Sequence, residues 1–135
     1  MTAPVKSAAD LKGKRGLRRL LNATRYSWQG LKAAFQNEAA FREECLCAVV
    51  LIPVAFFLPI PVLEKIVLVQ SILFVLLAEI LNSAIEAAVD RFGPEIHPLV
   101  GRAKDMGSAA VMIALAAAAL SWILITGPIL FAILD

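Results

Sequence analysis

The sequence predicts an all-α membrane protein: an N-terminal amphipathic interfacial helix followed by three transmembrane helices, with the N-terminus inside and the C-terminus outside. Three observations support this prediction: the composition, three long apolar segments, and an uneven distribution of basic residues. Of the 135 residues, 60% are hydrophobic, and the mean hydropathy is +0.79. Apolar residues make up roughly 45–50% of an ordinary soluble domain. The length favours one domain.

Each apolar segment is long enough to cross a bilayer, because a helix needs ~20 mostly apolar residues to span a ~30 Å hydrocarbon core. The segments run over residues 45–63, 66–81 and 109–134. With their flanks, they predict transmembrane helices at about 39–59, 64–91 and 104–131. In the first, the prolines predict a kink near Pro53 and an end near Pro59. Pro98 and Gly101 predict an irregular loop before the third.

Basic residues gather on one side of the predicted spans. Nine of the 13 precede the first span, three lie between the second and third spans, and only Lys65 lies between the first and second. Three crossings place the two large groups on the same side, which the positive-inside rule identifies as the cytoplasm. This basic face is expected to attract anionic headgroups and polyphosphates. Without a recognition motif, nucleic acid is not an expected partner.

The N-terminal region precedes the first span and has two parts. Residues 1–14 are polar and rich in small residues, and we predict a disordered tail there. Over about residues 15–36, apolar residues recur at spacings of three and four opposite a basic face, which is typical of a helix lying in the membrane interface. On the residues alone, a simple surface anchor is as well supported as a functional element. Residues 15–135 are predicted to form one membrane domain.

A polar face on the second span is the most informative feature of the sequence. Its members are Glu79, Asn82, Glu86 and Asp90. They share one helix face and cover about 16 Å along the axis. If Lys65 marks the outer interface, Glu79 lies ~21 Å further in, near the cytoplasmic edge of the hydrocarbon core. Ionisable residues at such depth are costly, so this face indicates a functional site.

The depths of these residues predict different roles. Glu79, partly desolvated, can accept a proton from a hydroxyl at the headgroup boundary. Glu86, nearer to water, can hold a hard cation such as Mg²⁺ together with Glu38. Lys104 can neutralise phosphate charge. Asp105 either belongs to this site or simply complements the start of a helix.

The residues alone do not choose the reaction. The sequence has no P-loop and none of the HRD and DFG motifs of protein kinases. His97, the only histidine, either contacts a nucleotide or is a solvated loop residue.

Several motifs resemble the prokaryotic diacylglycerol kinase family. They are YSWQGL at 26–31, NEAAFR at 37–42, EILNSAIE at 79–86 with DR at 90–91, and GRAKDMGSAA at 101–110. The resemblance covers about residues 18–124. It implies a homotrimeric kinase of the bacterial inner membrane, with active sites shared between subunits on the cytoplasmic side. It also implies that ATP and Mg²⁺ are used to phosphorylate diacylglycerol to phosphatidic acid, which recycles diacylglycerol into phospholipid synthesis.

The resemblance also implies roles for individual residues. Glu79 is the general base, supported by Asn82, and the Mg²⁺ ligands are Glu38 and Glu86. The residues on the ATP side are Arg19, Tyr26, Glu38, Glu86, Glu95, His97, Lys104 and Asp105. The residues on the lipid side are Ser27, Trp28, Arg42, Glu79 and Ser108.

Two alternatives stay open at this point. A related enzyme that phosphorylates undecaprenol would have the same acidic face and differ only at residues that contact the lipid. A non-enzymatic membrane subunit would instead pair its acidic residues with basic residues of a partner.

Overall fold

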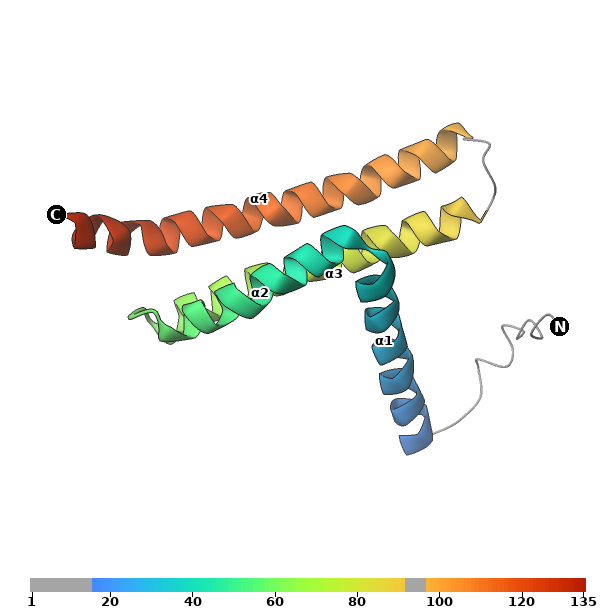
Figure 1. The fold of residues 1–135 in the computed structure, drawn as a ribbon, viewed down its shortest axis with the longest axis horizontal. Coiled ribbons are helices and arrows are strands. Elements are labelled where there is room, and N and C mark those ends of the chain that lie inside the picture. The colour runs from blue at the N-terminus through green and yellow to red at the C-terminus, as the bar shows by residue number, and fades with distance from the viewer. Residues whose placement is uncertain (1–15, 92–96) are drawn as a thin grey trace. The chain divides into compact units, whose positions relative to one another are not determined.

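The computed structural model describes residues 16–91 and 97–135, which form four α-helices and no strand (Figure 1). The helices are α1 (Leu17–Asn37), α2 (Ala39–Phe57), α3 (Val62–Asp90) and α4 (Pro98–Leu134). The all-α prediction is therefore confirmed for these residues. The predicted tail at 1–14 and Glu95 lie outside them. The chain divides into two units, Met1–Ala33 and Ala34–Asp135, each described by itself below.

The first unit contains most of α1. The helix follows Gly16, which has a φ of 77° and whose carbonyl oxygen accepts hydrogen bonds from the backbone N–H groups of Arg19 and Leu20. A positive φ costs glycine little, because glycine has no Cβ. Large apolar side chains of this part of α1, among them Leu21 and Trp28, are exposed.

Arg42 stabilises the junction at which α1 ends and α2 begins. Glu38 has an extended backbone there and is the N-cap of α2. The Nη1 atom of Arg42 donates to the carbonyl oxygens of Phe35 and Gln36, each at 3.1 Å. Carbonyls in the last turn of a helix have no helical donor, and an arginine side chain can supply one. Arg42, predicted on the lipid side, thus has a structural role within the second unit.

A tight turn joins α2 to α3. α2 ends at Phe57, two residues before Pro59, and the Leu58 N–H donates to the carbonyl oxygen of Val54 at 3.1 Å. The Lys65 ammonium donates to the carbonyl oxygen of Phe56 at 2.7 Å and so satisfies a second orphan acceptor. The boundaries of α1, α2 and α3 lie within two residues of the predicted ones, the normal uncertainty of helix ends.

α3 is the central helix of the second unit, since it packs against both α2 and α4 (Figure 1). The buried apolar side chains of this unit are Ala34, Phe41, Ala48, Ala55, Leu68, Ile72 and Val75. Ala48 and Ala55 lie seven residues apart on α2, and such small residues allow helices to approach closely. Leu68 of α3 is fully buried between the helices.

Two helices of the described residues are long and apolar enough to cross a membrane, namely α3 and the part of α4 over Pro98–Ile133. Many of the large apolar side chains on α2, α3 and α4 are exposed. Exposed apolar surface of this extent is expected where helices meet lipid or other chains.

The start of α4 corrects the prediction. The helix begins at Pro98, six residues before position 104. The Nδ1 atom of His97 accepts a hydrogen bond from the Leu99 N–H at 3.2 Å, and the His97 carbonyl oxygen accepts from the N–H groups of Val100 and Gly101. A proline at the first helical position has the required φ and loses no hydrogen bond. The predicted irregular loop at Pro98 and Gly101 was therefore wrong, because Pro98 starts the helix.

Candidate functional site

Glu79 and Asn82 lie on the face of α3 that is buried within the second unit. Their exposed fractions are 6% and 9%. Glu86 lies on the same face, about one turn beyond Asn82 and two turns beyond Glu79, and is half-buried. The residues that share this face by their spacing therefore point into the second unit, and the other helices cover Glu79 and Asn82 most completely. Burying a carboxylate in such surroundings is costly, and that cost indicates a functional site.

Three further carboxylates interact electrostatically with Glu79 and form a cluster with it. Those of Glu86 and Glu38 interact electrostatically with it through space, and so does that of Glu44. Glu38 reaches the cluster as the N-cap of α2, whereas Glu44 lies one and a half turns into that helix. Like charges this close repel one another strongly in apolar surroundings, so the cluster favours binding a proton or a cation.

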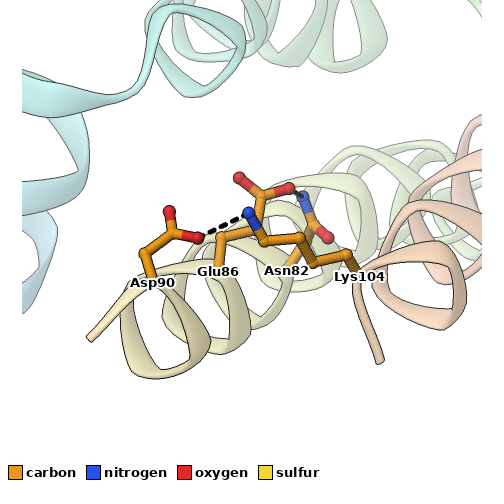
Figure 2. A network of polar contacts seen from close by, with 4 residues as sticks. All are labelled: Asn82, Glu86, Asp90 and Lys104. Atoms are coloured by element: carbon orange, nitrogen blue, oxygen red, sulfur yellow. Dashed lines mark hydrogen bonds and ion pairs between the residues drawn. The ribbon is translucent and has the colours of Figure 1, made fainter. Parts of the chain in front are cut away.

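A pair of polar contacts extends the cluster toward the end of α3 (Figure 2). Asn82 Nδ2 donates to Glu86 Oε1 at 3.2 Å, which orients that carboxylate. Lys104 of α4 forms an ion pair with Asp90 and also interacts electrostatically with Glu86. The site thus has a cation beside its outer carboxylates. Because Lys104 and Asp90 are both well exposed, this pair contributes little to stability.

Gly107 lets α4 come very close to Asn82. A Cβ at position 107 would overlap Oδ1 of Asn82 and lie 3.3 Å from its Cγ and 3.6 Å from its Cα. The Oδ1 atom itself is buried and has no hydrogen-bond partner among the described residues. An unpaired buried acceptor is costly, so Asn82 has the capacity to accept a hydrogen bond from a bound molecule.

An apolar groove opens beside Glu44, between α2, α3 and α4. Its volume is about 610 Å³, and Leu51, Val75 and Leu115 are among the residues that line it. Glu44 Oε2 and Trp122 Nε1, on two of these helices, are both buried without a hydrogen-bond partner in the described part of the chain. The groove therefore combines apolar walls with two unsatisfied polar atoms, which suits an amphipathic ligand.

The remaining predicted site residues have different positions. Asp105 and Ser108 are exposed in the first turns of α4, and His97 is its exposed N-cap. Another group belongs to the first unit and is exposed on α1: Arg19, Tyr26, Ser27 and Trp28. Their roles stay predictions, as does that of Glu95.

The sequence analysis missed Glu44 and Gly107. Glu44 follows Arg42 and Glu43 in a charged helix start, so nothing in the pattern distinguishes it from its neighbours. Gly107 was noticed only as part of a motif, because a close approach between two helices is invisible in one sequence. A conspicuous glycine within a helix pattern is the signal that points to such an approach.

The carboxylates around Glu79 could bind a divalent cation only together with oxygens from another molecule. Among the residues that the structure describes, no group of three His, Cys, Asp or Glu side chains is arranged to hold a metal ion. Mg²⁺ usually needs only one or two carboxylates when substrate phosphates supply the other oxygens. Glu38 and Glu86, which both act on Glu79 through space, fit that requirement.

The geometry defines a class of protein: a helical membrane-type protein with a carboxylate cluster, a neighbouring lysine and an apolar groove at one site. The family model for prokaryotic diacylglycerol kinase matches residues 25–126. The chain belongs to this family.

Relatives of this chain support that assignment. It is 53% identical to the diacylglycerol kinase of Haemophilus influenzae over 116 residues, covering 86% of this chain and 95% of that protein. Identity to the diacylglycerol kinase of Pseudomonas aeruginosa is 52% over 116 residues, covering 86% and 94%. Identity to the diacylglycerol kinase of Escherichia coli strain K12 is 50% over 107 residues, covering 79% and 88%.

Gly107→Ala is expected to reduce kinase activity by roughly 10²-fold, since an error of about 1 Å in a positioning group has that effect. The added methyl must displace Asn82 or push α4 away, and either change disturbs Glu86 and Lys104. The measurement is transfer of labelled phosphate from ATP to diacylglycerol in mixed micelles. Gly127→Ala is the control, because nothing lies within 4 Å of a Cβ at that position. Equal activity of the two variants would contradict this account.

Proposed function

We propose that the chain transfers the γ-phosphate of ATP to the free hydroxyl of diacylglycerol, forming phosphatidic acid at the cytoplasmic face of the bacterial inner membrane. The product would return diacylglycerol to phospholipid synthesis. The observation that supports this most is the position of Glu79, which is almost fully buried on a membrane-capable helix and surrounded by further carboxylates. The names of the relatives agree with this substrate.

The proposed topology has three membrane spans, α2, α3 and α4, with α1 as an interfacial helix. α3 and α4 qualify by length and hydropathy. α2 packs along α3 and is joined to it by a tight turn, so it must lie at the same depth. Twelve of the 13 basic residues then fall on the side of the N-terminus, which supports N-in and C-out. The exposed apolar side chains of α1 suit a helix in the interface.

Glu79 acts as the base in the proposed reaction. Its carboxylate takes the proton of the acceptor hydroxyl while the hydroxyl oxygen forms a bond to the γ-phosphorus. The bond from that phosphorus to the oxygen bridging the β- and γ-phosphates breaks, and ADP leaves. Burial keeps water away from the carboxylate, and the apolar groove beside Glu44 provides space for the acyl part of the acceptor.

The outer half of the cluster holds the nucleotide. Glu38 and Glu86 are the residues that would hold Mg²⁺, which when bound neutralises charge on the ATP phosphates. Asn82 keeps Glu86 oriented through its hydrogen bond, and Lys104 adds positive charge beside it. Phosphoryl transfer depends mainly on positioning and charge neutralisation, and these few groups supply both functions. The expected assembly is a homotrimer whose subunits share active sites.

The acceptor assay tests the proposal directly. Purified protein in mixed micelles is given labelled ATP, Mg²⁺, and either diacylglycerol or undecaprenol. Phosphorylation of diacylglycerol is the expected result. Transfer to neither lipid would overturn the kinase proposal, whereas a strong preference for undecaprenol would overturn only the choice of acceptor.

Glu79→Gln is expected to reduce turnover by roughly 10²–10⁴-fold, because the amide cannot accept the hydroxyl proton. The apparent KM for ATP should change little, since Glu79 does not contact the nucleotide in this mechanism. Glu64→Gln is the control, because Glu64 is an acid in the first turn at the opposite end of α3. Near-normal turnover of Glu79→Gln would exclude it as the base.

Glu86→Gln separates charge from hydrogen bonding. The amide oxygen of glutamine still accepts from Asn82, so the local geometry is kept while one metal-binding charge is removed. The apparent KM for Mg²⁺-ATP should rise by roughly tenfold, the low end for loss of a supporting metal contact. Raising the Mg²⁺ concentration should restore part of the rate. An unchanged KM, equal to that of the control Glu64→Gln, would rule out the metal role.

A further inference from the structure

Ser83 is a buried residue of α3 to which the proposed reaction gives no role. Its exposed fraction is 8%, and its Oγ atom has no hydrogen-bond partner among the described residues. A buried hydroxyl without a partner costs free energy, and such groups are rare in folded proteins. The Oγ atom of Ser83 is therefore free to bond to a molecule that enters the site.

Other hydroxyl groups in the helices of this chain show the usual alternative. The hydroxyls of Thr24, Ser71, Ser121 and Thr126 each donate to a backbone carbonyl oxygen three or four residues earlier, at 2.7–3.1 Å. This bond satisfies a serine or threonine inside a helix without any ligand. Ser71 is the best comparison, because it lies on the same helix and is also buried, with an exposed fraction of 9%. Ser83 does not make this bond, so its donor stays available.

The position of Ser83 lies between the base and the outer carboxylate of the site. Ser83 follows Glu79 by four residues and precedes Glu86 by three. Residues at these spacings are neighbours on a helix surface, with Cβ atoms roughly 5–6 Å apart. In the proposed reaction, the γ-phosphoryl group must lie between Glu79, which activates the acceptor hydroxyl, and Glu86, which holds the nucleotide phosphates through the metal. The Ser83 hydroxyl therefore borders the space that this group must occupy.

Free hydrogen-bond donors are scarce at this face of α3. Ionised carboxylates only accept hydrogen bonds, and so do the oxygens of a phosphoryl group. Asn82 Nδ2 already donates to Glu86. The Lys104 ammonium is already paired with Asp90. Ser83 Oγ can thus donate to a phosphoryl oxygen without breaking an existing contact of the described residues.

We propose that the Ser83 hydroxyl donates a hydrogen bond to an oxygen of the γ-phosphoryl group while that group passes from ATP to the acceptor. This inference rests on the proposed function and adds a catalytic residue to it. The oxygens of the moving phosphoryl group share its negative charge, so a donor already fixed beside them lowers the barrier. Ser83 forms no covalent bond and transfers no proton, and Glu79 still accepts the proton of the acceptor hydroxyl.

Ser83→Ala removes the hydroxyl and leaves a small side chain. The kcat for diacylglycerol phosphorylation in mixed micelles should fall by roughly 10–10²-fold, the effect of losing a hydrogen bond to a charged group. The KM for ATP should change little, because the bond is strongest in the transition state. The Kd of ATP, measured by equilibrium dialysis without an acceptor, should also change little. A higher Kd and KM with an unchanged kcat would make Ser83 a nucleotide-binding residue only and overturn the proposal.

Ser71→Ala is the matched control. It removes an equally buried hydroxyl from the same helix, but one whose partner is the carbonyl oxygen of Leu68. Its kcat should stay close to that of the wild-type chain. Equal kcat values for Ser71→Ala and Ser83→Ala would overturn the proposal.

Ser83→Thr separates hydrogen bonding from packing. Threonine keeps the hydroxyl and adds a methyl group, whereas alanine only removes the oxygen. If the hydroxyl acts on the phosphoryl group, Ser83→Thr should retain more of the kcat than Ser83→Ala. An equal or greater loss in Ser83→Thr would assign the effect to packing and overturn the proposal.

The activity of the wild-type chain keeps this inference apart from the proposed function. A wild-type chain that phosphorylates neither diacylglycerol nor undecaprenol would overturn the kinase proposal and this role of Ser83 with it. An active wild-type chain with an equally active Ser83→Ala variant would overturn the role of Ser83 alone.

Discussion

The burial of Glu79 is the constraint on which the rest of the second unit depends. A carboxylate among apolar helices is unfavourable unless nearby groups share its proton or bind its charge. The structure adds three further carboxylates near the same end of the helices, which increase that cost and make the cluster a site for a bound proton or cation. Glu38 and Glu44 come from α2 and Glu86 from the next turns of α3. The opposite end of α2 and α3, around the fully buried Leu68, is held by apolar packing.

The approach of α4 to α3 at Gly107 brings the cation to the site. Because position 107 has no side chain, the backbone of α4 can pack directly against Asn82 of α3. Lys104 lies one turn before Gly107, on the same side of α4, so the approach that packs Gly107 also places the ammonium near Asp90 and Glu86. The same contact leaves Oδ1 of Asn82 unpaired. The close approach of the two backbones therefore places the Lys104 ammonium beside Asp90 and Glu86. It also places the unpaired Oδ1 of Asn82 on the same helix face as Glu79.

The sequence predicted the parts of this site that depend on a single helix. The shared face of Glu79, Asn82 and Glu86 follows from helix periodicity, and in the structure Glu79 and Asn82 are buried on this face while Glu86 is half-buried. Contacts between helices could not be predicted, because a single sequence does not indicate which turns of two helices pack against each other. Glu44 was missed for that reason. The start of α4 was missed for a local reason. In sequence, a proline in a loop cannot be distinguished from a proline at the first position of a helix, and only the structure shows that His97 caps α4.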